Sequence, residues 1–99
     1  MNLNGYETFT TFWQDFTIAD AFGAGAVQDT FDRAFNEWKD DYKYLTEFVM
    51  ILNHKCWQHY YKGNEGVSRL YANLYHQAND YAYDTLKGDE LSYYFNITD

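Results

Sequence analysis

The chain has 99 residues, of which 46% are hydrophobic and 22% aromatic, so it can bury the core of one compact domain and is too apolar for intrinsic disorder. Its formal net charge is −8, with 15 Asp and Glu residues against 7 Lys and Arg residues. Direct binding to nucleic acid or to an anionic membrane is therefore not expected, because both need clustered cations. A charged partner should be basic.

Hydropathy and cysteine content indicate the compartment. No apolar run is long enough to cross a bilayer, and the opening "MNLNGYETF" has no basic stretch followed by an apolar one. The single cysteine cannot form an internal disulfide. We therefore expect a cytoplasmic protein that folds as one helical domain over residues 1–99.

The spacing of apolar residues is helical throughout, and the chain has no proline. It predicts helices at about 8–22 (continuous, or broken near Thr17), 26–39, 42–62 and 65–87, and a short helical turn at about 89–95. Glycines lie between these segments. The predicted fold class is all-α: a small helical bundle of four main helices plus a short C-terminal helical turn.

Each predicted helix carries an apolar stripe at i, i+3, i+4 and i+7 that should face the core. The stripes comprise Phe9, Phe12, Trp13 and Phe16; Val27, Phe31, Ala34, Phe35 and Trp38; Leu45, Val49, Leu52, Cys56 and Tyr60; and Leu70, Leu74, Ala78, Tyr81 and Leu86. We expect eight of these residues in particular to be buried: Phe35, Trp38, Leu45, Val49, Leu52, Leu70, Leu74 and Ala78.

Residues at the predicted helix ends suit capping. Asp40 or Asp41 can cap the helix that begins near residue 42, and Asn64 can cap the helix that follows it. Gly63 and Gly88 suit the left-handed position just past a helix end.

The stretch "LNHKCWQHYYKGN" at 52–64 concentrates residues that could coordinate a metal or act as nucleophiles. On a helix Cys56 and His59 share a face, whereas His54 and His59 do not, and a closed zinc site needs four ligands. His76 is the other strong candidate. We interpret the stretch as a helix end, with Cys56 as a small core residue and His59 and Lys62 near the last carbonyls. No cofactor is expected, and no carboxylate stands at a suggestive spacing from a histidine or lysine, so we do not expect an enzyme.

The segment "IADAFGAGAVQDTFDR" at 18–33 is similar to a helix-turn-helix corner. Its second helix, however, would present Gln28, Asp29 and Asp32 to DNA with only Arg33 as a cation. The aspartates would repel phosphates. The segment therefore predicts a corner between two helices and does not predict DNA binding.

Two sets of residues are candidates for binding a partner protein. The carboxylates form either an ordinary solvated face or a negatively charged ridge, and they are Asp29, Asp32, Glu37, Asp40 and Asp41. The tyrosines of the C-terminal half either pack with their hydroxyl groups exposed to water or form an interface. The candidates for such an interface are Tyr93 and Tyr94.

Four stretches carry a resemblance to short acidic proteins encoded on phages and conjugative elements of Gram-positive bacteria: "IADAFG", "VQDTFDRAFNEWKDDYKYLTEFVMILNHKCWQHYYKGN", "LYANLY" and "DYAYDTLKGDELSYYFNITD". The likeness covers about residues 9–99. That group has no assigned activity, so the resemblance transfers no site residue. It implies a context in which small inhibitors of host defence are common, some of them anti-CRISPR proteins that resemble DNA in charge.

These observations lead to two hypotheses. The first is a non-enzymatic, acidic DNA mimic that inhibits a host defence system by binding a basic, nucleic-acid-binding host protein. The alternative is a structural or accessory protein that self-associates, as a homodimer for example, through a tyrosine-rich interface. A small enzyme or metal protein built on His54, Cys56, His59 and His76 ranks last.

Overall fold

The computed structural model describes residues 5–98, and the side chains of residues 11–98. This part of the chain forms five helices and no strand: α1 (Gly5–Phe22), α2 (Ala24–Trp38), α3 (Tyr42–Tyr61), α4 (Glu65–Thr85) and α5 (Asp89–Thr98). The predicted all-α class is confirmed. The predicted C-terminal turn is a helix of 10 residues, so the helices number five and not four.

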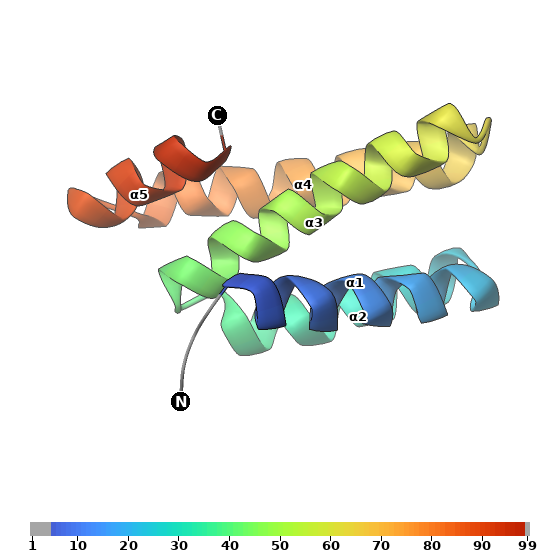
Figure 1. The fold of residues 1–99 in the computed structure, drawn as a ribbon, viewed down its shortest axis with the longest axis horizontal. Helices are drawn as coiled ribbons and strands as arrows, with labels where there is room; N and C mark the ends of the chain where they lie inside the picture. Colours follow the sequence, from blue (N-terminus) through green and yellow to red (C-terminus); the bar gives the residue numbers. More distant parts are fainter. Residues whose placement is uncertain (1–4, 99) are drawn as a thin grey trace.

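The helices lie in two layers (Figure 1). α1 and α2 lie side by side in one layer, α3 and α4 form the other, and α5 lies along the second layer. α3 contacts each of the other four helices. It is therefore the central element, and its residues 44–52 are buried on several sides.

The core is largely aromatic and centres on Phe48 of α3. Its ring lies 5.2 Å from that of Phe12, 5.9 Å from that of Phe16 and 5.5 Å from that of Phe31, measured between ring centroids. Aromatic pairs at such distances stabilise a core beyond the area that they bury. These contacts join α1 and α2 to α3.

Most of the predicted core is correct. Five of the eight residues expected to be buried are so, namely Leu45, Val49, Leu52, Leu74 and Ala78, while Phe35, Trp38 and Leu70 are half-buried at its edge. The inward place predicted for Tyr60 is wrong, because α3 turns Ile51, Lys55 and His59 inward instead. Phe9 was also predicted to face the core, but its side chain lies outside the described residues.

The helix ends follow the predicted chemistry in part. Asp41 caps α3 by accepting hydrogen bonds from the backbone N–H groups of Lys43 and Tyr44. Gly63, at φ 81°, lets Asn64 donate its backbone N–H to His59 O at 2.9 Å, which closes α3. Asn64 itself precedes α4, but its side chain makes no capping bond because it reaches His59 instead.

α5 continues past the predicted end at residue 95 to Thr98, whose hydroxyl donates to Tyr94 O at 2.7 Å within the helix. Tyr94 is fully buried, and its hydroxyl donates a hydrogen bond to the Asn79 side chain of α4. α1 is not broken at Thr17, whose hydroxyl donates to Trp13 O at 2.7 Å within the helix. Among the described residues, none of the helices combines the length and the low polarity that spanning a bilayer would require.

Candidate functional site

A polar cluster with a buried centre joins α1, α3 and α4. It consists of Thr17 and Asp20 from α1, Lys55, Gln58 and His59 from α3, and Tyr71 from α4. Lys55 is 1% exposed, and Tyr71 is fully buried. Charged groups are buried only with close partners, so the contacts of this cluster decide its role.

The Lys55 ammonium has a partner for each of its N–H groups. Its Nζ lies 2.8 Å from Thr17 Oγ1, 3.2 Å from Asp20 Oδ2 and 3.2 Å from Gln58 Oε1. It also lies 4.4 Å from the centre of the Trp13 ring, where the face of the ring attracts a cation. The ammonium is thus fully bound within the protein.

Asp20 is the acceptor on which the cluster converges. His59 Nε2 lies 2.9 Å from its Oδ2, and the Tyr71 hydroxyl donates to its Oδ1 at 2.5 Å. The Asn64 amide lies 3.3 Å from His59 Nδ1, an arrangement that suits a neutral ring with its proton on Nε2. The His59 and Tyr71 rings stack at 5.5 Å.

This cluster is built to hold helices together. Burial, the hydrogen bond to Asp20 and the charge of Asp20 raise the pKa of Tyr71, so its phenol remains a donor. Among the described residues, no buried side-chain nitrogen or oxygen lacks a hydrogen-bond partner. With Lys55 and Tyr71 enclosed and fully bonded, the arrangement fixes how α1 crosses α3 and α4.

The cluster bears on two sequence interpretations. His59 does lie in the last turn of α3, but it bonds to Asp20 across the core and not to its own helix end. No carboxylate stands at a suggestive spacing from a histidine or lysine in the sequence, yet Asp20 pairs with Lys55 and His59, which lie 35 and 39 positions away. Sequence spacing within one helix cannot show such a pair.

The candidate metal ligands are spread over the structure. Cys56 lies at the edge of the core with its Sγ 3.6 Å from Ser68 Oγ, while His54 and His76 are exposed. Within residues 11–98, no three His, Cys, Asp or Glu side chains come together in a manner that would hold an ion.

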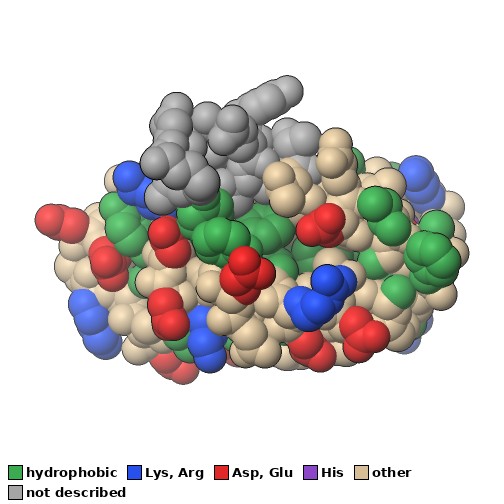
Figure 2. Space-filling model, turned by 90° about the horizontal axis from the view of Figure 1, so that it is seen from below, with side chains coloured by type: hydrophobic (Ala, Val, Ile, Leu, Met, Phe, Trp, Pro, Cys, Tyr) green, Lys and Arg blue, Asp and Glu red, His purple; other side chains and the backbone are tan. Residues whose placement is uncertain are grey.

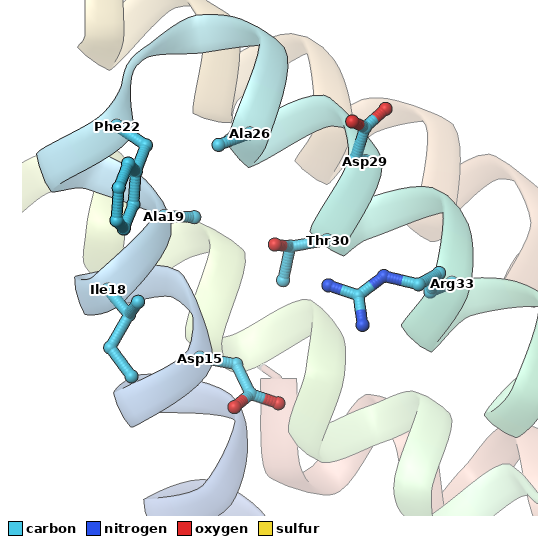
Figure 3. Close-up of a pocket in the computed structure, with 8 residues that line it drawn as sticks. All are labelled: Asp15, Ile18, Ala19, Phe22, Ala26, Asp29, Thr30 and Arg33. Carbon is cyan, nitrogen blue, oxygen red and sulfur yellow. The ribbon is translucent and has the colours of Figure 1, made fainter.

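A surface groove runs along the contact between α1 and α2, on the side away from α3. Its larger hollow, about 370 Å³, is shown in Figure 3 and is lined by Asp15, Ile18, Ala19, Phe22, Ala26, Asp29, Thr30 and Arg33. A second hollow of about 220 Å³ shares Asp15, Thr30 and Arg33 and continues to Glu37 and Trp38. We call the two together the α1/α2 groove.

The α1/α2 groove combines exposed apolar residues with charged ones. Ile18 is 60% and Phe22 80% exposed, although both belong to a helix that buries its other face. Asp15 and Arg33 extend from opposite helices toward the space between them (Figure 3). The groove is therefore an apolar surface with a charged rim, a combination common at protein-binding sites.

The predicted carboxylates lie on or next to this groove. Asp29, Asp32 and Glu37 are exposed on α2, and Asp40 is exposed just past its end, where it accepts a hydrogen bond from Tyr81. Asp41 is half-buried and serves as the cap of α3. Figure 2 shows Asp and Glu side chains spread along this side of the molecule, with Lys and Arg side chains between them.

The two tyrosine candidates do not form an exposed pair. Tyr94 is inside the protein, so its side chain contributes no surface to a partner. Tyr93 is half-buried and packs edge-on against Tyr42, at 5.2 Å between ring centroids. Burial, and then the charge of Glu47, raise the pKa of its phenol.

Three exposed aromatic residues cluster instead on the outer face of α3. Trp57, Tyr60 and Tyr61 are 50%, 57% and 79% exposed, and their rings contact one another at 5.4 to 5.9 Å. The sequence interpretation placed Tyr60 in the core stripe and did not name this cluster as a candidate surface. The signal was present, because positions 57, 60 and 61 share a face of the helix opposite His59.

Comparison of the chain with protein-family models, with curated proteins and with solved structures gives no match. The resemblance to proteins of mobile elements therefore stays a prediction from the sequence.

Proposed function

We propose that this chain is a non-enzymatic protein that binds a basic, nucleic-acid-binding protein and blocks its nucleic-acid surface. The observation that carries the proposal is the placement of Asp29 and Asp32. Both are exposed on α2, three residues and so about 60° apart around the axis, on the side opposite Val27 and Phe31. Their charge is thus displayed by a helix that the core holds in place.

The spacing of these carboxylates suits a surface that normally binds phosphates. Residues three apart on a helix have Cβ atoms about 5–6 Å apart, so the two side chains present closely spaced negative charges, as a nucleic-acid backbone does. Asp29 and Asp32 provide one such pair, while Glu37 is exposed elsewhere on α2 and Asp40 just past its end. A basic groove could accept them in place of a backbone and release its counterions.

The context implied by the sequence resemblance fits this activity. Under that context the protein acts as an anti-defence inhibitor of the anti-CRISPR kind, and its target is a host protein that works on nucleic acid. The net charge of −8 supports fast association with such a target at low ionic strength.

Charge reversal tests the proposal. The variant Asp29→Lys/Asp32→Lys/Glu37→Lys moves the formal charge from −8 to −2, since three reversals add six. The matched control Asp80→Lys/Asp84→Lys/Glu90→Lys makes the same change at exposed positions on α4 and α5. The immobilised proteins are offered an extract of a Gram-positive host, and the retained proteins are identified by mass spectrometry.

The native protein and the control should retain the same basic nucleic-acid-binding protein, and the α2 variant should lose it. Duplex DNA should compete, and retention should fall steeply as salt rises from about 50 to about 300 mM. Retention that is insensitive to salt, or equal for both triple variants, would contradict the proposal.

Self-association is a second candidate function, favoured by the exposed Trp57, Tyr60 and Tyr61 rings and not by Tyr93 and Tyr94. Aromatic side chains supply large contact area at low entropic cost. Light scattering of the native protein and of Trp57→Ala/Tyr61→Ala would show a dimer that the substitutions dissociate. A native monomer at about 100 μM would exclude a dimer with a micromolar dissociation constant or tighter.

A further inference from the structure

The α1/α2 groove has a shape, a length and a charge that together describe its occupant. We propose that it docks an amphipathic basic helix of the partner protein, whose apolar face covers Ile18 and Phe22 and whose cations face Asp15 and Asp29. This inference rests on the proposed function and specifies the part of the partner that is recognised.

The shape of the groove fits a helix. α1 and α2 lie side by side, and α3 contacts both of them on their inner side. A helix seated between two others is the ordinary arrangement of bundles, because its side chains enter the grooves between theirs. The outer side of the same pair carries the α1/α2 groove, so a second helix can occupy it in the same way.

The length of the groove suits about three helical turns. Its lining on α1 runs from Thr11 to Phe22. Eleven steps of 1.5 Å give about 16 Å, close to three turns of an occupying helix. Three turns offer the i, i+3, i+4 and i+7 anchors that recognition of an amphipathic helix uses.

The charge of the groove selects a basic occupant. Its two hollows together contain Asp15, Asp29 and Glu37 against Arg33, which is three negative charges and one positive. An acidic helix would be repelled, whereas lysines or arginines beside its apolar face would meet the carboxylates. Arg33 opposes such a partner and should weaken its binding.

Phe22 should contribute most of the apolar contact. It is 80% exposed in the free protein, so a partner could remove nearly its whole side chain from water. Full burial of such a side chain corresponds to a change of about tenfold or more in affinity. Its exposure also means that Phe22→Ala should leave the fold intact.

Two synthetic peptides of about 14 residues serve as probes. The first places leucines on one face of a helix and lysines on the other; the second has the same composition with the leucines spread around the helix. Dissociation constants are measured by titration calorimetry at about 50 mM salt. Phe22→Ala is compared with Tyr61→Ala, which removes an equally exposed aromatic ring (79%) from α3, outside the groove.

The amphipathic peptide should bind the native protein and Tyr61→Ala alike, and Phe22→Ala or Ile18→Ala about tenfold more weakly. Arg33→Gln should strengthen binding about threefold, because a repelling charge is removed. Equal binding of the two peptides, or equal effects of Phe22→Ala and Tyr61→Ala, would overturn the groove as the docking site and leave the proposed function standing. Failure of both peptides to bind would likewise overturn the groove, whereas the proposed function fails only if the charge reversals on α2 leave retention of the basic protein unchanged.

Discussion

Asp20 Oδ2 on α1 lies 3.2 Å from Lys55 Nζ on α3, and this ion pair has an ammonium that is 1% exposed. A buried ammonium without a partner costs free energy. Because Lys55 has this carboxylate as its partner only when α1 crosses α3 as observed, the pair favours that crossing.

Replacement of Lys55 by Met should destabilise the protein by about 3 kcal/mol, the lower end for breaking a buried pair. Asp20 then keeps His59 and Tyr71 but loses its cationic partner. Urea unfolding measures the loss. Arg69→Met removes the cation of an exposed pair with Glu65, at 3.8 Å, and should change stability by less than about 1 kcal/mol.

A double variant, Asp20→Asn/Lys55→Met, isolates the coupling between the two charges. It should be more stable than the sum of the single changes implies, because neither charge is then left alone. Additive losses would show that the two residues act independently.

Replacement of Tyr71 by Phe should cost about 1–3 kcal/mol, because Asp20 Oδ1 loses the hydroxyl that donates to it at 2.5 Å. The ring that stacks on His59 is retained, so the packing changes little. Tyr81→Phe is the matched control. Its hydroxyl donates to the exposed Asp40 at 3.2 Å, where water can replace it, so thermal unfolding should barely shift. Equal effects of the two variants would argue against a special role of the cluster.

Replacement of Glu47 by Gln should stabilise the protein at neutral pH. Burial raises the pKa of this carboxyl above its usual value of 4.5, so its ionisation is less favourable in the folded than in the unfolded protein. The resulting loss of stability is absent below the pKa of Glu47 in the unfolded protein. It appears as the pH rises toward the pKa in the folded protein and persists above it. The gain should therefore be present at about pH 7 and fade toward about pH 3.5.

Denaturant unfolding across that pH range gives the comparison, with Glu90→Gln at an exposed position as the control. A gain for Glu47→Gln that persists undiminished at the acid end would show that the carboxyl is not perturbed.

Truncation of Leu52 to Ala should cost about 2–5 kcal/mol, because the side chain is fully buried in the centre of α3 and would leave a cavity. Phe22→Ala removes a larger side chain from the surface and should cost less than about 0.5 kcal/mol. Chemical denaturation of both variants checks the contrast, and a small effect at Leu52 would place it outside the core.

The sequence by itself determined where the helices lie and most of what they bury. Glycines at 63 and 88, the cap at Asp41 and the periodicity of residues such as Val49 and Leu74 act within a few positions of each other, and such local signals need no knowledge of neighbouring helices. The tertiary structure alone decided that Asp20, Lys55 and His59 meet, that Tyr94 is buried and that Phe22 is exposed at a groove that Asp29 also lines. A row such as Ile51, Lys55 and His59 could have signalled a buried cation, but not its partner. The physical reason is that the partner depends on how α1 crosses α3, which the periodicity of either helix does not determine.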